Sequence, residues 1–171
     1  GKPAAATHDP DGTSHFKGHA AISAGITEEI MLRLKQPRAL RELVVTLVRY
    51  HDDRIGPDNL KRSLNRLGPE AGLLMLKLQY ADALTHAPHV AEKAHKILRL
   101  YDEAEEMIRS GSCLFIRDLA IDGQDLIAIG FKEGAGIGRT LNFLLDQVLS
   151  GYLENDREEL LAQAREVLAR P

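Results

Sequence analysis

Hydrophobic residues recur every three or four positions along most of the chain, which is the period of an α-helix. Residues 16–36 carry one such stripe, made of Ile22, Ile26, Ile30 and Leu34, and Pro37 ends it. Residues 38–52 carry a second stripe, and the same period predicts helices at residues 57–67, 70–85 and 90–108, with a turn at Pro88. Residues 1–15 are predicted to form a polar loop, and no segment alternates convincingly as a strand. The pattern predicts an all-α fold.

The pattern changes after Gly111, where short helices are predicted between closely spaced glycines. A last helix is predicted from a capping signal at Asn155, with Glu158 three residues later. We therefore expect a helical body over residues 1–110 and a small helical tail over residues 111–171.

Composition places the chain among soluble globular proteins. Its 171 residues are 44% hydrophobic and 27% charged, which are ordinary values. Charges interrupt every apolar run, so neither a membrane helix nor a signal peptide is predicted. Cys113 is the only cysteine, which excludes an internal disulfide and makes the cytoplasm the expected location.

The net charge of −3 is unevenly distributed along the sequence. Residues 1–68 carry 11 Lys and Arg against 8 Asp and Glu, whereas residues 111–171 carry 6 against 10. Within the first part, Lys61, Arg62 and Arg66 form one basic face of a short predicted helix. That face has two interpretations, a solvated surface or a contact for RNA phosphates.

Three ionisable residues interrupt the apolar faces of predicted helices. His19 precedes Ile22 by three positions, His51 follows Val48 by three, and Asp82 follows Leu78 at helical spacing. Two imidazoles and a carboxylate from packed helices are suitable ligands for a divalent metal ion. Alternatively, each histidine is a hydrogen-bonded core residue, and Asp82 caps a turn, pairs with Arg49 or Lys77, or reaches water. Asp52, if the helix continued, would point about 100° away from His51.

The order of these segments resembles the C-terminal half of a bacterial tRNA nucleotidyltransferase, the CCA-adding enzyme of the nucleotidyltransferase and poly(A) polymerase superfamily. The resemblance covers essentially the whole chain. It rests on Phe16-Lys17-Gly18-His19, Leu47-Val48-Arg49-Tyr50-His51-Asp52, Ala81-Asp82-Ala83, Ile121-Asp122-Gly123-Gln124-Asp125-Leu126-Ile127 and Gly136-Ile137-Gly138. Glu133 and Ala135 depart from the family, in which prolines are common at these positions.

The resemblance implies an HD-type helical body and a tail that together bind tRNA. It assigns His19, His51 and Asp82 to a residual metal centre for Mg²⁺, Mn²⁺, Zn²⁺ or Ni²⁺, whose remaining histidine and His-Asp ligands are expected upstream of Gly1. The nucleotide-transferring head, which uses CTP, ATP and Mg²⁺, and the nucleotide-selecting neck are also expected upstream. No catalytic residue of nucleotide transfer is therefore expected in this chain.

Three functions follow as hypotheses from the sequence. The first is a tRNA-binding fragment of an enzyme that adds CCA, or part of it, to the tRNA 3′ end. The second is a fragment of a metal-dependent HD phosphohydrolase, and the third is a non-catalytic helical interaction module. A homodimer is left open in each case.

Overall fold

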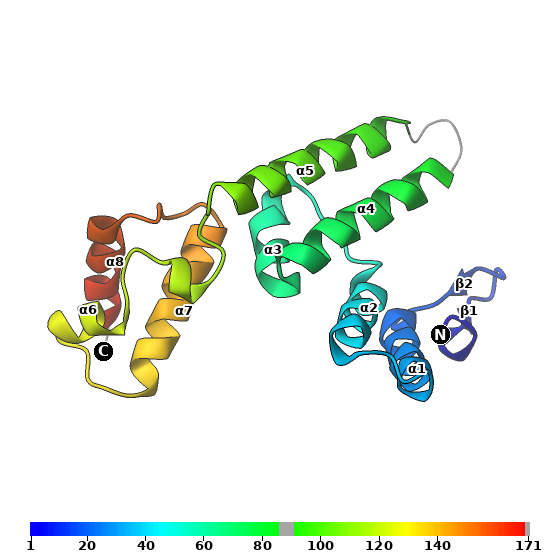
Figure 1. Ribbon diagram of the computed structural model, residues 1–171, viewed down its shortest axis with the longest axis horizontal. Coiled ribbons are helices and arrows are strands. Elements are labelled where there is room, and N and C mark those ends of the chain that lie inside the picture. The colour runs from blue at the N-terminus through cyan, green and yellow to red at the C-terminus, as the bar shows by residue number, and fades with distance from the viewer. Residues whose placement is uncertain (86–90, 170–171) are drawn as a thin grey trace. The chain divides into compact units, whose positions relative to one another are not determined.

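A computed structural model describes residues 1–85 and 91–169, and its fold is all-α as predicted (Figure 1). The helices in these residues are α1 (His19–Arg33), α2 (Arg38–Tyr50), α3 (Leu60–Leu67), α4 (Pro69–Thr85), α5 (Ala91–Arg109), α6 (Gly123–Ala128), α7 (Ala135–Leu149) and α8 (Arg157–Ala169). Short 3₁₀ turns are η1 (Pro3–Ala5), η2 (Pro57–Asn59) and η4 (Ile116–Asp118). None of the described helices combines the length and the hydropathy that a membrane span needs. The turn predicted at Pro88 lies outside the described residues.

The N-terminal loop differs from the prediction in one respect. Residues 7–8 (β1, Thr7–His8) and residues 14–15 (β2, Ser14–His15) form a small antiparallel ribbon, in which Thr7 faces His15 and His8 faces Ser14. Strands of two residues are too short to produce a recognisable alternation of apolar and polar positions.

The chain divides into two compact units. The first contains residues 1–55 and 70–101, and the second contains residues 56–69 and 102–171. Helix α3 therefore belongs to the same unit as α6, α7 and α8, and α5 extends into both units. The division of function between a body (1–110) and a tail (111–171) stays a prediction.

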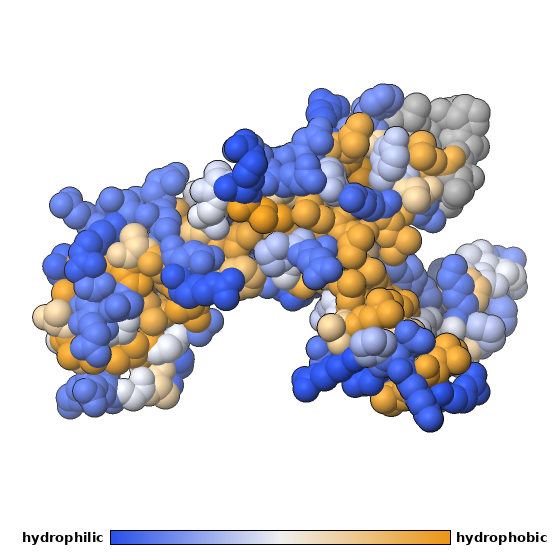
Figure 2. All heavy atoms as spheres, in the orientation of Figure 1, coloured by the Kyte–Doolittle hydropathy of each residue, from blue (hydrophilic) through white to orange (hydrophobic). Residues whose placement is uncertain are grey.

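The buried face of α1 is not the stripe that the sequence predicts. Ile22, Ile26 and Ile30 are 37%, 45% and 40% exposed, while Ala24 is completely buried. Helix α1 packs chiefly against α2, and its half-buried positions include Thr27 and Met31, which share a face with Ala24 at helical spacing. The more buried face of α1 is therefore the one that carries Ala24, while the larger isoleucines remain at the surface. Figure 2 shows such hydrophobic side chains over α1 and α2, beside strongly hydrophilic ones.

The second unit has a core of leucines from α3 and α7 with partners from α6 and α8. Its fully buried side chains include Leu64 of α3, Leu126 of α6, Leu144 of α7 and Leu160 of α8. Each such side chain contributes roughly 1.5–3 kcal/mol through burial. This core fixes the relative positions of the four helices within the unit.

At two positions the structure explains why the residue is glycine. A Cβ atom at Gly123 would lie 3.2 Å from the Cγ2 atom of Ile137, so Gly123 permits the close approach of α6 and α7. Gly134 precedes α7 with φ of 132°, a conformation that L side chains rarely adopt. This part of the glycine-rich series therefore builds the start of α7.

The cap of α8 corrects a prediction. Asp156, not Asn155, caps this helix, because its Oδ1 atom accepts hydrogen bonds from the backbone N–H groups of Glu158 (2.9 Å) and Glu159 (3.1 Å). Asn155 instead bridges two segments, accepting from the Ala120 N–H (2.9 Å) and donating to the Asp118 carbonyl (2.8 Å). Both residue types make good caps, so sequence alone does not discriminate between adjacent positions.

Candidate metal centre

The first imidazole of the site is placed by the start of α1. Gly18 has φ of 83° and turns the chain immediately before His19, which is the first residue of the helix. The carbonyl oxygen of Phe16 accepts two hydrogen bonds from His19, one from its backbone N–H (3.1 Å) and one from its Nδ1–H (2.9 Å). The ring is therefore held at a buried position with Nδ1 occupied.

The second imidazole is placed by the end of α2. His51 directly follows the last residue of this helix, and its Nδ1 atom lies 2.6 Å from the carbonyl oxygen of Val48. A carbonyl oxygen can only accept, so Nδ1 of His51 carries the proton of this hydrogen bond. The two histidines thus have the same tautomer for the same reason, and this tautomer is inferred from their hydrogen bonds.

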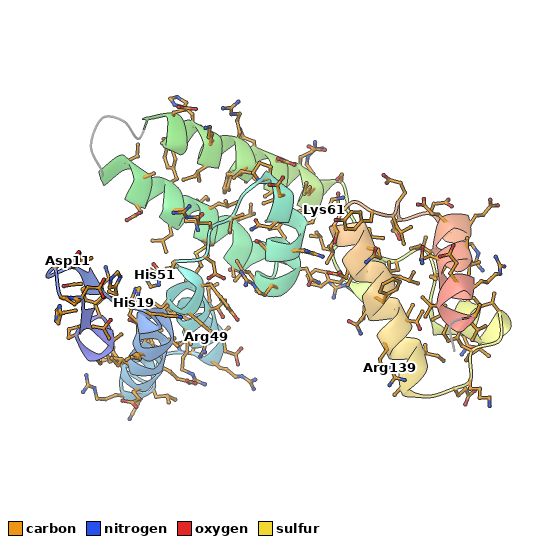
Figure 3. The ribbon with its side chains drawn as sticks, turned by 180° about the vertical axis from the view of Figure 1, so that it is seen from behind. Asp11, His19, Arg49, His51, Lys61 and Arg139 are labelled. Atoms are coloured by element: carbon orange, nitrogen blue, oxygen red, sulfur yellow. The ribbon has the colours of Figure 1, made fainter. Side chains whose placement is uncertain are left out.

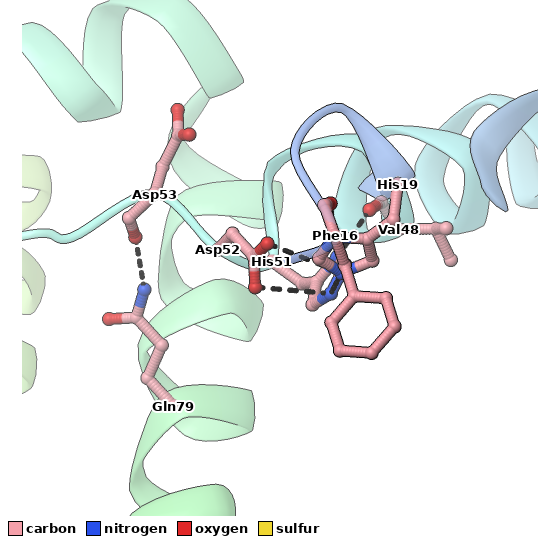
Figure 4. A network of polar contacts seen from close by, with 7 residues as sticks. All are labelled: Phe16, His19, Val48, His51, Asp52, Asp53 and Gln79. Carbon is pink, nitrogen blue, oxygen red and sulfur yellow. Dashed lines mark hydrogen bonds and ion pairs between the residues drawn. The ribbon is translucent and has the colours of Figure 1, made fainter. Parts of the chain in front are cut away.

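The two rings meet at their Nε2 atoms, as Figure 4 shows. These atoms lie 3.2 Å apart, with the ring centroids 5.1 Å apart and the ring planes at 77°. Because each neutral imidazole has its proton on Nδ1, both Nε2 atoms present lone pairs to the same point in space. Two lone pairs at this distance repel unless a proton or a metal ion lies between them.

Asp52 completes the cluster with a carboxylate. Its Oδ2 atom lies 3.2 Å from Nε2 of His19, and its Oδ1 atom lies 3.3 Å from Nε2 of His51. One ligand atom from each of the three residues lies within 4.8 Å of the others. The Asp52 side chain is 56% exposed, against 11% for His19. The cluster is therefore open to solvent on the side of Asp52.

The donor set fits a divalent cation. Zn–N bonds of roughly 2.0–2.1 Å at a tetrahedral angle separate two nitrogens by about 3.3 Å, close to the 3.2 Å observed between the Nε2 atoms. Hydrogen bonds from both Nδ1 atoms to backbone carbonyls orient the rings as the outer partners of metal-bound histidines usually do. Three protein ligands leave coordination positions for water or a substrate.

Asp82 does not belong to this cluster. The group of ligand atoms contains Asp52 instead, and Asp82 lies on an exposed part of α4. The sequence argument placed Asp82 on the face of Leu78, but Leu78 is 45% exposed, and the buried side chains of α4 include Met75, Leu76 and Ala83. On a helix rich in apolar residues, the period alone does not identify the buried face. Asp82 is thus an exposed residue of α4 rather than a buried one.

Asp52 joins the cluster because α2 ends before it. The expected angle of about 100° from His51 assumed a continuing helix, whereas α2 ends at Tyr50 and residues 51–53 form a turn. The carbonyl oxygen of Asp53 accepts a hydrogen bond from Nε2 of Gln79 (2.6 Å), which ties this turn to α4. The sequence signal that could have identified Asp52 is its position directly after His51, at the end of a predicted helix.

The basic face on α3 is partly engaged within the second unit. Arg62 donates to Oδ1 of Asp146 on α7 (2.8 Å) and to Oγ of Ser150, which directly follows this helix. Lys61, labelled in Figure 3, is half-buried, and Arg66 is exposed. Arg62 therefore joins α3 to α7, and the role of these three residues in RNA binding stays a prediction.

Comparisons with known proteins place the chain in a family. The family model for tRNA nucleotidyltransferase domain 2 matches residues 20–164, which cover most of both units described above and two members of the cluster, His51 and Asp52. The chain belongs to this tRNA nucleotidyltransferase family.

Two curated relatives agree with this assignment. The chain is 31% identical over 163 residues to a CC-adding tRNA nucleotidyltransferase of Thermus thermophilus, a match covering 92% of this chain and 36% of that protein. It is 45% identical over 51 residues to a CCA-adding enzyme of Limosilactobacillus fermentum, covering 30% of this chain and 13% of that protein. The chain thus spans about a third of the first relative's length. No solved structure matches significantly.

Proposed function

We propose that this chain binds tRNA as the helical body and tail of a tRNA nucleotidyltransferase, and so supports addition of CCA, or part of it, to the tRNA 3′ end. The observation that carries the proposal is the family match over residues 20–164. The CC-adding relative, similar over 92% of this chain, supports it. Folded RNA is bound largely through its shape and its phosphates, for which a helical surface with basic residues is suitable. CTP, ATP and Mg²⁺ would act in a head outside this chain.

The test is direct binding of deacylated tRNA to the 171-residue chain. Fluorescence anisotropy with labelled tRNA should give saturable binding at low salt, weakening as salt is raised. A DNA duplex of similar length is the control, and it should bind more weakly. If tRNA does not bind even at low salt while circular dichroism shows a folded helical protein, the tRNA proposal is wrong. The helical interaction module would then be the better hypothesis.

We also propose that His19, His51 and Asp52 hold a divalent cation. The convergence of two Nε2 lone pairs and a carboxylate supports this proposal. The two Nε2 atoms lie 3.2 Å apart, and the carboxylate oxygens of Asp52 lie 3.2 Å from Nε2 of His19 and 3.3 Å from Nε2 of His51. A bound cation would supply Lewis-acid chemistry toward a phosphoester oxygen or a bound water. The two imidazoles would bind it through Nε2, and the exposed carboxylate of Asp52 would balance its charge.

The same cluster supports phosphoester hydrolysis as a second candidate function. Three ligands suit one metal ion, whereas a two-metal centre needs further ligands. Incubation with bis(p-nitrophenyl) phosphate and Mn²⁺ or Ni²⁺ tests this activity. Release of nitrophenolate that is abolished in a His51→Ala variant would support the hydrolase, and release unchanged in that variant would contradict it. The homodimer and the cytoplasmic location remain predictions.

A further inference from the structure

The tip of the α1–α2 hairpin carries a concentrated positive charge. Arg33, Lys35, Arg38 and Arg41 lie within nine residues, and residues 30–41 contain no Asp or Glu. Arg33, Lys35 and Arg38 are exposed, and Arg41 is half-buried. These side chains extend from the last turn of α1, the connecting loop and the first turn of α2. They therefore occupy one end of the hairpin.

Most of this charge is not neutralised by the protein. In the described part of the chain, Arg38 alone among the four makes an ion pair, with Glu42 at 2.6 Å. Both partners are largely exposed, at 81% and 59%, so the pair is weak and an anion can compete for the guanidinium. The other three cations are available to a ligand.

Lys35 occupies a backbone conformation that favours glycine. Its φ is 51°, and the loop closes α1 with two hydrogen bonds, from the Lys35 N–H to the Leu32 carbonyl (2.9 Å) and from the Gln36 N–H to the Met31 carbonyl (3.0 Å). This is a Schellman arrangement, in which the left-handed position is usually glycine. A lysine there costs about 1–2 kcal/mol of backbone strain. A strained residue at the centre of a charged surface points to a function for its charge.

We propose that this hairpin tip, residues 33–41, is a contact surface for the phosphate backbone of RNA. The proposal rests on the proposed tRNA binding and assigns a part of the protein to it. Three of the four cations are arginines, whose planar guanidinium groups match phosphate oxygens in two parallel hydrogen bonds. The exposed Leu32, Leu34 and Leu40 between them would also suit an anionic membrane, so lipid binding is an outcome that the test must distinguish.

The experiment compares tRNA affinity and its salt dependence in two variants of the full chain. In the Arg33→Gln/Lys35→Gly/Arg41→Gln variant, each lost phosphate contact should reduce the slope of log K against log salt by about 1. The affinity should fall roughly tenfold or more, equally for tRNAs of different sequence, because phosphate contacts carry no sequence information. The Arg99→Gln variant is the control, since Arg99 is an exposed cation on α5 and should have little effect.

Lys35→Gly alone separates function from folding. It should weaken tRNA binding while raising the unfolding temperature, and a variant that failed to fold could not produce this combination. If the wild-type chain and the triple variant bind tRNA equally well, the tip proposal is wrong and the proposed function remains. If Arg99→Gln loses as much tRNA affinity as the triple variant, the effect arises from overall charge, and the tip proposal is wrong as well. The last outcome uses vesicles of phosphatidylserine and phosphatidylcholine. If the wild-type chain binds these vesicles, and the triple variant does not bind them but keeps its tRNA affinity, the tip contacts a membrane surface instead of RNA. If the wild-type chain binds no tRNA, both proposals fail.

Discussion

The Nε2 atoms of His19 and His51 lie 3.2 Å apart, although both rings use Nδ1 to donate to a backbone carbonyl. Neither ring can donate to the other while both are neutral in this tautomer, so a cation between the two nitrogens would relieve the repulsion of their lone pairs. Asp52 reaches both nitrogens and adds a negative charge to the same point. The geometry and the charge of the cluster thus both support the proposed cation site.

Metal binding is the first prediction. Isothermal titration with Zn²⁺ or Mn²⁺ should detect one site, and His19→Ala or His51→Ala should weaken it by at least about tenfold, since even outer partners of metal ligands contribute 10–100-fold. Asp52→Asn should weaken the site by removing its charge. Asp82→Asn is the matched control and should leave the affinity unchanged. Heat that persists in His19→Ala, or a loss in Asp82→Asn as large as in Asp52→Asn, would contradict this assignment.

The left-handed Lys35 predicts an unusual effect on stability. Lys35→Gly should raise the free energy of unfolding by about 0.5–1 kcal/mol, because relief of the strain exceeds the entropy that glycine adds to the unfolded chain. Chemical denaturation followed by circular dichroism measures this change. Lys35→Ala is the control: it removes the charge, retains a Cβ atom and the strain, and should give little gain. Equal stabilisation by both variants would indicate that charge repulsion, not backbone strain, is relieved.

Asp125 should make the second unit sensitive to acid. The Arg157 guanidinium, followed by a backbone hydrogen bond from Asp122, holds the pKa of the Asp125 carboxyl below its usual value. The lowered pKa stabilises the folded state above the unfolded pKa of about 3.9, and this contribution is lost as pH falls through the folded pKa. Asp125→Asn should therefore lower the unfolding temperature at pH 7, and its difference from wild type should shrink below about pH 4. Arg157→Gln removes the same pair and should not add fully to Asp125→Asn. A difference that is independent of pH would contradict the ion pair.

Cys113 should be unreactive in the folded protein. Burial, with a smaller contribution from Asp118, raises the pKa of its thiol to about 11, against an ordinary value near 9. Iodoacetamide at pH 8 should modify it slowly in buffer and rapidly in denaturant, since the thiolate is the nucleophile. Between about pH 9 and 11 the unfolded state loses this proton and the folded state keeps it. The stability advantage of wild type over Cys113→Ala should therefore fall with rising pH, by up to about 1.4 kcal/mol per pH unit. Rapid alkylation of the native protein at pH 8 would contradict the burial of this thiol.

Local signals in the sequence predicted much of the fold. Pro37 lies between the end of α1 and the start of α2, and Gly68 directly follows the end of α3, as the sequence predicted. Such breaks can be predicted because proline and glycine act through the backbone of a few neighbouring residues. The faces were harder to predict. Helix α1 contains apolar residues on more than one side, so its own period did not distinguish the Ile22 face from the Ala24 face. Only the packing of α2 decided between them.

The sequence by itself determined the helical class, the family and the two histidines of the site, because residue type and spacing are local properties that a single chain displays. Only the tertiary structure decided that Asp52, and not Asp82, meets those histidines. The physical reason is that a ligand set is defined by distances between atoms. The end of α2 at Tyr50 turns Asp52 back toward His19, whose own position far earlier in the chain is set by a hydrogen bond to Phe16.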